Sequence, residues 1–287
     1  MSDAYAVIGW PLGHTLSPVM HQAALDELGL DATYTALPTP PGTEIDRFED
    51  VRTGALAGLN VTIPHKLAAF RAVDRRTLAA ERTGAVNTVI RDGPHLLGDN
   101  TDPYGFIQAL RQFGGFDPSG ASVVVVGAGG AARAAVIALS DSGARRILVA
   151  NRTEARAHEL ANDLQASEGA PIDSCALNEP RLSRDLAAAH LLVNTSSVGM
   201  AGGPAPAASP VPAGCLHPDL FVYDIVYRPA VTPLLAAAQA IGAPTLGGLE
   251  MLVMQGAASL QQWTGRPAPA RTMLAAARAA LEGSDSP

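Results

Sequence analysis

Lys66 is the one lysine among the 20 lysine and arginine residues of this 287-residue chain. Arginine keeps its proton in proteins, whereas the pKa of a lysine shifts readily with burial and with neighbouring charges. A chain that uses arginine for almost every cation and keeps a single amine suggests a chemical task for that amine. A surface lysine that persists by chance accounts for the same observation, so the lysine alone does not establish a chemical role.

A glycine-rich turn lies between two apolar segments in the middle of the chain. Residues 122–126 are a continuous β-branched run, typical of a strand covered on both faces, and residues 127–132 read Gly-Ala-Gly-Gly-Ala-Ala. An alanine-rich helical segment then runs to Ser142, and a second apolar run covers residues 146–150. This order matches the dinucleotide-binding fingerprint, with alanine in its third small position.

The small residues of the turn have separate tasks in such a site. Gly127 permits the tight turn, Gly129 lets the backbone approach a pyrophosphate, and Ala132 allows close packing of helix and strand. The N-terminus of the following helix supplies unpaired N–H groups and a partial positive charge. A tight turn without a ligand is the alternative, and the two flanking strands favour the nucleotide site.

An arginine stands where an NAD site usually has a carboxylate. The second strand is followed by Asn151, Arg152 and Thr153, with Arg156 a turn further on. In NAD sites an acidic residue about 20 positions past the glycines binds the ribose 2′-hydroxyl. A guanidinium instead suits a 2′-phosphate, through bidentate, charge-assisted hydrogen bonds. We therefore predict NADP(H) as the cofactor; a solvated surface arginine is the alternative.

Polar side chains gather where strands of the first half end. Ligands of α/β sheets bind in the crevice beyond the carboxyl ends of the strands. Each cluster by itself is explained by a helix cap, a turn or a loop, but beside the lone lysine the set favours a hydroxyl-rich pocket for a small polyol. The clusters are Thr15 with Ser17, Asn60 with Thr62 and Lys66, and Asn87 with Asp99, Asn100 and Asp102.

Strands and helices alternate along the chain, which predicts an α/β fold whose first half has a mostly parallel sheet with one antiparallel strand. Ser17 is expected to cap a helix with Pro18 in its first turn, Pro64 to open another, and Thr232 to cap a third. The expected strands cover residues 4–9, 33–37, 56–63, 85–91, 95–98, 122–126, 146–150, 191–194 and 221–226. The expected helices include residues 17–29, 43–53, 74–83, 103–114, 153–167, 233–241, 248–264 and 269–281, and residues 202–218 are expected to form an irregular loop.

The composition predicts a soluble globular protein, with 47% hydrophobic and 16% charged residues. The net charge of −7 and the lack of any basic cluster argue against a nucleic-acid partner. Cys175 and Cys215 lack the spacing of a metal site and fit a reduced, cytoplasmic protein. No signal peptide and no apolar run of about 18 residues is recognisable, so we expect no membrane partner.

Several further motifs occur in order along nearly the whole chain. In the first half they are residues 9–18 (Gly-Trp-Pro-Leu-Gly-His-Thr-Leu-Ser-Pro), 60–66 (Asn-Val-Thr-Ile-Pro-His-Lys), 84–88 (Gly-Ala-Val-Asn-Thr) and 98–102 (Gly-Asp-Asn-Thr-Asp). They continue in the glycine turn, 151–153, 194–200 (Asn-Thr-Ser-Ser-Val-Gly-Met) and 248–255 (Gly-Leu-Glu-Met-Leu-Val-Met-Gln). Together they resemble the motifs of the shikimate dehydrogenase family, which includes shikimate and quinate dehydrogenases.

This resemblance implies an NADP-dependent oxidoreductase of aromatic amino acid biosynthesis that reversibly reduces 3-dehydroshikimate to shikimate. Lys66 matches the catalytic lysine of the family and Asp102 its partner. The ammonium group would stabilise the developing alkoxide and supply its proton, while the carboxylate would orient and balance the ammonium. The sequence leaves open whether the lysine acts mainly in proton transfer or as an electrostatic anchor.

The resemblance also implies a two-domain α/β fold with the active site in the cleft between the domains. Residues 1–102 with 248–287 would form the substrate-binding domain, and residues 103–247 a Rossmann NADP-binding domain. Two residues, Thr15 and Ser17, would bind the substrate carboxylate. Ring hydroxyls would be bound by Asn60, Thr62, Asn87, Asp102 and Gln255, and Tyr227 matches a further substrate-side position. The residues expected to bind the cofactor are Gly127, Ala128, Gly129, Gly130, Ala131, Asn151, Arg152, Thr153, Arg156, Thr195, Ser196, Ile225 and Gly248.

The chain departs from the family pattern at three positions. Thr15 replaces the usual serine and adds a methyl group beside the expected carboxylate; Pro103 and Glu250 each replace a glycine. Quinate or an amino-shikimate analogue therefore stays open as the substrate, as does a sensor that has lost catalysis, although retention of Lys66 and Asp102 argues against the sensor. We expect a monomer or homodimer with a small-molecule substrate and no metal.

Overall fold

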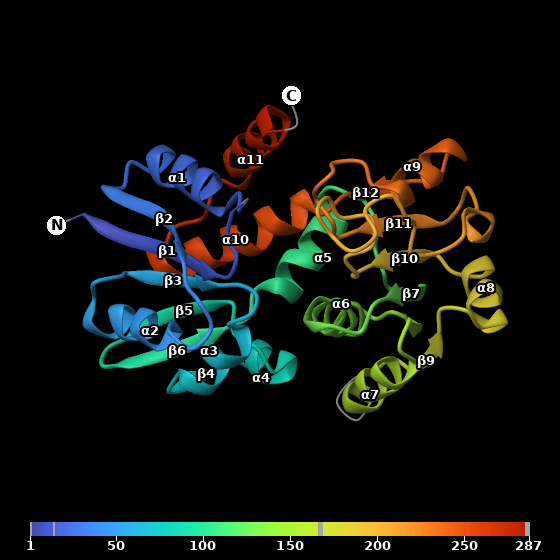
Figure 1. The fold of residues 1–287 in the computed structure, drawn as a ribbon, viewed down its shortest axis with the longest axis horizontal. Helices are drawn as coiled ribbons and strands as arrows, with labels where there is room; N and C mark the ends of the chain where they lie inside the picture. Colours follow the sequence, from blue (N-terminus) through green and yellow to red (C-terminus); the bar gives the residue numbers. More distant parts are fainter. Residues whose placement is uncertain (1, 14, 166–168, 285–287) are drawn as a thin grey trace. The chain divides into compact units, whose positions relative to one another are not determined.

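The computed structural model describes residues 2–13, 15–165 and 169–284. The chain divides into two compact units, Met1–Gly105 with Leu252–Pro287 and Phe106–Met251. Each unit contains one six-stranded sheet with helices packed against it (Figure 1). Among the described residues, no helix is both long and apolar enough to cross a membrane.

The first unit has the strand order β2-β1-β3-β5-β6-β4. Only β5 runs antiparallel to its neighbours β3 and β6, while the other pairs are parallel, so the predicted single antiparallel strand is confirmed. The strands are β1 (Asp3–Gly9), β2 (Ala32–Pro38), β3 (Gly58–Val61), β4 (Arg75–Arg76), β5 (Thr88–Asp92) and β6 (His95–Asp99). The helices that belong to it wholly or in part are α1 (Ser17–Glu27), α2 (Glu44–Thr53), α3 (Lys66–Ala72), α4 (Leu78–Thr83), α5 (Asp102–Gln112), α10 (Leu249–Thr264) and α11 (Ala270–Ser284).

The two faces of this sheet differ because successive side chains of a strand point in opposite directions. One face supplies an apolar core with α2 and α3: Ala6, Ile8, Leu59, Val61 and Val89 pack with Phe48, Val51 and Ala69. On the other face lies α10, where the Trp263 ring stacks on Tyr5 at 5.2 Å and its Nε1 donates to the carbonyl of Val89 at 3.1 Å. This second face also carries the polar side chains of Asn60 and Thr88.

The second unit has a fully parallel sheet in the order β12-β11-β10-β7-β8-β9. The order reverses between β7 and β10, as in the Rossmann fold, and dinucleotides bind at such a reversal. The strands are β7 (Ser122–Val126), β8 (Arg146–Asn151), β9 (Ile172–Ala176), β10 (Leu191–Asn194), β11 (Phe221–Asp224) and β12 (Thr245–Leu246). The helices are α6 (Gly130–Asp141), α7 (Glu154–Gln165), α8 (Pro180–Ala187) and α9 (Pro233–Ala240), with a short 3-10 turn at Ala213–Cys215.

Three local predictions were wrong. Ser17 is the first residue of α1 and not its cap, since Leu16 occupies the cap position. Pro64 precedes α3 by two residues, following a cis peptide bond in the turn after β3. Residues 74–83 are not one helix: Arg75–Arg76 pair with β6, and Thr77 then caps α4 by accepting from the N–H of Ala80 at 3.2 Å. A good capping threonine inside the segment separates strand from helix.

The second unit contains elements that the sequence pattern did not indicate. β9 has five residues, of which only Ile172 and Cys175 are buried, α8 has eight residues, and β12 has two. The helix expected at 153–167 begins at Glu154 and is described to Gln165; residues 166 and 167 lie outside the described residues. Thr232 caps α9 as predicted, by accepting from the N–H of Leu235.

Candidate active site

Lys66 and Asp102 form an ion pair in the first unit. Each is the first residue of a helix, α3 and α5 respectively, and Lys66 Nζ lies 2.5 Å from Asp102 Oδ2. The lysine side chain is 28% exposed and the aspartate side chain 15%. The amine is therefore reachable by a small ligand, while the carboxylate is mostly covered.

The amide of Asn87 holds the other oxygen of this carboxylate. Its Nδ2 donates to Asp102 Oδ1 at 2.8 Å, and its Oδ1 accepts from the backbone N–H of Thr101 and the hydroxyl of Thr88, both at 2.9 Å. Because a backbone N–H can only donate, the contact with Thr101 fixes which end of the amide carries the oxygen. Asp102 is thus held through both oxygens, one by Lys66 and one by Asn87.

Asn60 and Gln255 lie around the same amide. Asn60 Nδ2 donates to the carbonyl of Asn87 at 3.1 Å and to Ser259 Oγ at 3.0 Å, and Asn60 Oδ1 accepts from the hydroxyl of Tyr34 at 2.8 Å. The amide hydrogens of Asn60 are therefore already used by protein groups. Gln255 Oε1 lies 3.5 Å from Asn87 Nδ2, and Gln255 Nε2 donates to a backbone carbonyl of α10 at 2.7 Å.

Thr15 and Ser17 lie two residues apart at the start of α1, where the Ser17 N–H donates to Thr15 Oγ1 at 3.3 Å. Ser17 is buried beside Tyr34, and burial raises the pKa of that phenol well above its ordinary value. Thr62 is half-buried after β3, and within the described residues its hydroxyl makes no hydrogen bond. No hydrogen bond in the described chain joins Thr15, Ser17 or Thr62 to Lys66.

His65, next to the lysine, is a buried residue that sequence reasoning did not single out. Its buried ring has Nε2 2.7 Å from the carbonyl of Thr39 and Nδ1 3.5 Å from Glu44 Oε2. These contacts anchor the residue before α3 to the segment after β2 and to the start of α2. The only sequence signal was its place beside Lys66.

The glycine turn of the second unit follows β7 and opens α6. Gly127 has φ +114°, which favours glycine, and a Cβ there would collide with Thr195 Oγ1. At Gly129 and Gly130 a Cβ would meet no heavy atom within 4 Å, while Ala132 is fully buried. The turn is therefore closely packed at its first glycine and open at the helix N-terminus, which fits a bound phosphate.

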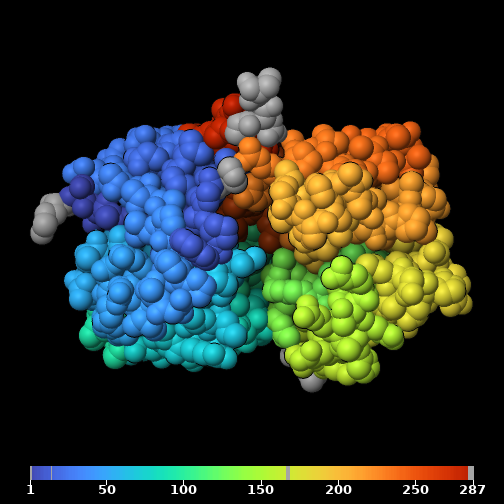
Figure 2. All heavy atoms as spheres, viewed as in Figure 1, coloured from blue at the N-terminus to red at the C-terminus, as the bar shows by residue number. Residues whose placement is uncertain are grey.

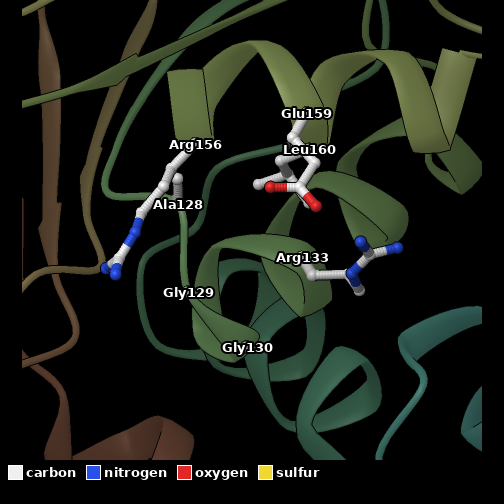
Figure 3. A pocket seen from close by; sticks show the side chains of 7 residues that line it. All are labelled: Ala128, Gly129, Gly130, Arg133, Arg156, Glu159 and Leu160. Atoms are coloured by element: carbon white, nitrogen blue, oxygen red, sulfur yellow. The ribbon is translucent and has the colours of Figure 1, made fainter. Parts of the chain in front are cut away.

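A surface cavity of about 320 Å³ lies beside this turn. Figure 3 shows the turn passing below α7, with the side chains of Arg156 and Glu159 extending from that helix toward it. In the space-filling view, α7 (yellow-green) lies at the surface of its unit (Figure 2). The lining residues are Ala128, Gly129, Gly130, Arg133, Arg156, Glu159 and Leu160.

Two arginines near this cavity are available to an anion. Arg152 and Arg156 are exposed, and among the described residues neither guanidinium has a hydrogen bond or an ion pair. Asn151 Nδ2 donates to the carbonyl of Thr153 at 2.9 Å and so shapes the turn that carries them. Arg133, which sequence reasoning missed although it lies in the first turns of α6, is paired with Asp163 at 2.8 Å.

The loops after β10 and β11 are held by a buried polar network. Asp224 is fully buried and accepts from Asn194 Nδ2 at 2.9 Å, the N–H of Val226 at 3.0 Å and the hydroxyl of Thr232 at 2.7 Å. Burial raises the pKa of Asp224 to about 6, although these hydrogen bonds oppose the shift. Asn194 Oδ1 in turn accepts from the N–H and hydroxyl of Ser196 at 3.0 and 2.7 Å.

The remaining expected cofactor residues lie on these loops. Thr195 Oγ1 donates to the carbonyl of Val126 at 2.7 Å, which ties β10 to the glycine turn. A Cβ on Gly248 would overlap the carbonyl oxygen of Ile225, so only glycine fits there. Tyr227 is half-buried in the second unit, three residues after β11, and burial raises its pKa. Among the described residues, no group of three or more His, Cys, Asp or Glu side chains could hold a metal ion.

These features characterise the two units. One unit has a parallel sheet, a glycine turn of the dinucleotide-binding type and exposed arginines beside it. The other is an α/β unit whose buried polar network ends at a lysine–aspartate pair. Three family models match the chain. They describe a shikimate dehydrogenase substrate binding domain at residues 7–89, a shikimate/quinate 5-dehydrogenase at 108–197 and a shikimate 5′-dehydrogenase C-terminal domain at 248–278.

Relatives match over almost the full length. The shikimate dehydrogenase (NADP(+)) of Geobacter metallireducens is 42% identical over 277 residues, 96% of each chain. The shikimate 5-dehydrogenase of Thermus thermophilus in complex with NADP(H) and shikimate is 40% identical with a TM-score of 0.86, covering 97% of this chain and 100% of that one. A quinate dehydrogenase of Corynebacterium glutamicum in complex with NAD is 30% identical with a TM-score of 0.89, covering 97% and 99%. The chain belongs to the shikimate dehydrogenase family.

Proposed function

We propose that this protein is an NADP-dependent shikimate dehydrogenase, which interconverts 3-dehydroshikimate and shikimate in aromatic amino acid biosynthesis, with Lys66 and Asp102 as its catalytic pair. The observation that carries the catalytic assignment is the 2.5 Å contact between Lys66 Nζ and Asp102 Oδ2. It places the only lysine of the chain beside a carboxylate that Asn87 also holds.

The reaction needs a hydride donor and a proton for the developing alkoxide. Bound NADPH would supply the hydride. The ammonium of Lys66 stabilises negative charge on the ketone oxygen and gives it a proton. Asp102 keeps that ammonium in place and balances its charge, and Asn87 keeps the carboxylate directed at the amine.

The substrate contacts are proposed for residues of polar, uncharged type. Thr15 and Ser17 bind the carboxylate through hydroxyl groups. A site of buried amides and hydroxyls rejects an analogue that lacks a hydroxyl, because its own polar groups are then left unpaired. The proposed contacts to ring hydroxyls are Asn60, Thr62, Asn87, Asp102 and Gln255, and Tyr227 is proposed as a further substrate-side residue. The amide hydrogens of Asn60 are bonded to protein groups.

NADP is proposed to bind the second unit, and most of the substrate contacts are proposed for residues of the first. The open glycine turn at the N-terminus of α6 receives the pyrophosphate, and the unpaired guanidinium groups of Arg152 and Arg156 receive the 2′-phosphate. Gly127, Ala128, Gly129, Gly130 and Ala131 provide the turn, Asn151 and Thr153 support the arginines, and Thr195, Ser196, Ile225 and Gly248 lie toward the nicotinamide. In this assignment the substrate domain is residues 1–102 with 248–287, and the cofactor domain is 103–247.

Initial rates of the purified protein with shikimate, quinate and an amino-shikimate, each with NADP and NAD, test the proposal. We expect kcat/KM to be highest with shikimate and NADP. A preference for quinate would favour the alternative raised by the methyl group of Thr15 and by the likeness to a quinate dehydrogenase. Binding of shikimate without turnover would favour a sensor.

We also propose a cellular location and an oligomeric state for the protein. Cys175 and Cys215 are both free, which suits the reducing cytoplasm. We propose a monomer or a homodimer. Sedimentation at micromolar concentration distinguishes these states from larger assemblies.

A further inference from the structure

The Lys66–Asp102 pair stands at one end of a longer chain of buried polar groups in the first unit. The other end is the hydroxyl of Tyr34. Every member between these two ends is less than a tenth exposed, and two of them have no exposed surface at all. The members in between are Asn87, Thr88, Ser259 and Asn60.

Counting hydrogens gives the half of this chain near Asp102 a direction. Asn87 Oδ1 can only accept, so the 2.9 Å contact from Thr88 Oγ1 uses the single hydroxyl proton of Thr88. The 2.7 Å contact between Thr88 Oγ1 and Ser259 Oγ then uses the hydroxyl proton of Ser259. Ser259 also donates to the carbonyl of Gln255 at 3.1 Å, so its one proton is shared between two acceptors, of which Thr88 is the nearer. The donors therefore run from Ser259 through Thr88 and Asn87 to Asp102.

The other half continues in the same direction. Asn60 Nδ2 is identified by its contact with a backbone carbonyl, that of Asn87, and it also donates to Ser259 Oγ at 3.0 Å. Asn60 Oδ1 is therefore the acceptor for the Tyr34 hydroxyl at 2.8 Å. One continuous series of donors thus leads from Tyr34 to the carboxylate beside Lys66.

We infer that Thr88 and Ser259 are positioning residues, which hold the Asn87 amide in the orientation that donates to Asp102 and couple Asn60 and Tyr34 to the Lys66–Asp102 pair. Nothing else in the described chain offers Asn87 Oδ1 a side-chain donor except Thr101 Oγ1, at the longer distance of 3.2 Å. Buried hydrogen bonds polarise one another, so a missing hydroxyl affects its neighbours along the series. The expected effect on catalysis rests on the proposed function, whereas the expected effect on the position of Lys66 does not depend on it.

The single lysine makes a direct test available. In protein labelled with ¹³C,¹⁵N-lysine, the only side-chain amine signal comes from Lys66. Thr88→Val replaces a hydroxyl by a methyl group of similar size, and Ser259→Ala removes the hydroxyl that precedes it. We expect the Lys66 signal to move in both variants and to return toward its parental position in Thr88→Ser. Ser140→Ala is the control, since it removes a buried serine hydroxyl from helix α6 of the second unit.

Kinetics then test the link to catalysis. We expect kcat for shikimate oxidation to fall about tenfold in Thr88→Val and Ser259→Ala, with its pH profile displaced and KM for NADP unchanged. Thr88→Ser and Ser140→Ala should stay within about twofold of the parent. Lys66 signals and pH profiles that match the parent in folded Thr88→Val and Ser259→Ala would overturn the inference. Absence of turnover in the parent protein would instead reject the proposed function. The Lys66 signal would then still test whether Thr88 and Ser259 position the pair.

Discussion

Asp224 Oδ1 accepts a hydrogen bond from Asn194 Nδ2 at 2.9 Å, and neither residue is exposed to solvent. The two side chains connect the ends of the neighbouring parallel strands β10 and β11. Since the loops after these strands carry Thr195, Ser196 and Ile225, this one contact fixes much of the expected cofactor surface in the second unit.

The ionisation of Asp224 should make stability depend on pH. Its pKa is about 6 in the folded protein against 3.8 for the ordinary group, so the folded state binds the proton more tightly. The stabilising effect of protonation is complete below pH 3.8 and is lost as the pH rises through about 6. A difference of about two pKa units corresponds to about 3 kcal/mol of unfolding free energy. Urea unfolding at pH 5 and pH 7.5 should show about half of this decrease, about 1.4 kcal/mol, because the other half is lost between pH 3.8 and pH 5.

Asp224→Asn should remove that decrease and unfold at higher urea than the parent at pH 7.5. The amide oxygen can keep the bonds from Asn194 and Val226, and the amide nitrogen can donate to the hydroxyl of Thr232. Asp117→Asn, at an exposed carboxylate, is the control. Equal pH dependence in the parent and in Asp224→Asn would contradict the prediction.

Lys66→Ala should lower kcat by about 10²–10⁴ with a modest change in KM, because it removes the group that stabilises and protonates the alkoxide. Steady-state rates with saturating NADP and shikimate measure the effect. Arg71→Ala on the same helix, α3, removes an exposed cation and should leave kcat unchanged. A near-parental kcat in Lys66→Ala would reject the assignment.

Arg152→Asp should weaken binding of NADP, because a carboxylate repels the 2′-phosphate and can accept from a free 2′-hydroxyl. We expect kcat/KM with NADP to fall about 10- to 100-fold, the loss of one charge-assisted hydrogen bond, while that with NAD is kept or raised. Arg184→Ala, at an exposed arginine of α8, should not alter the ratio. An unchanged NADP-to-NAD ratio in Arg152→Asp would remove the residue from the site.

Adjacent glycines offer a matched pair for the loop before α10. A Cβ at residue 248 would overlap the carbonyl oxygen of Ile225, whereas at residue 247 the nearest heavy atom would be 3.8 Å away. Gly248→Ala should therefore lower Tm by several degrees, as expected for a loss of about 1–3 kcal/mol, and raise KM for NADP. Gly247→Ala should resemble the parent in both measurements. Similar behaviour of the two variants would contradict the close approach.

Sequence reasoning succeeded where local chemistry decides the outcome. The β-branched run, the glycine turn and the arginine after the next strand predicted β7, α6 and β8 because each signal lies within a few residues. The one antiparallel strand, β5, followed from a hairpin signal at Asp92 and Gly93. Tertiary pairing accounts for the failures: Arg75–Arg76 form a strand only because β6 provides a partner.

The same difference between local signals and tertiary contacts applies to the candidate site. Lys66 was singled out by its rarity, but its pairing with Asp102 was suggested by family resemblance, since the two are 36 positions apart. Nothing local marks Thr88 or Ser259, which look like an ordinary strand threonine and helix serine. Their importance arises from contacts that span 171 residues, and such contacts leave no trace in a single sequence.

The placement of α10 has a consequence for biosynthesis. Trp263 and Ser259 cover one face of the sheet that begins the chain, yet a ribosome makes them after the entire second unit. Until then Asn60, Thr88 and Tyr34 lack their contacts with α10, and the polar face of the first sheet is uncovered in the nascent chain. The second unit can complete its own sheet first, so the amino-terminal half of the protein matures last.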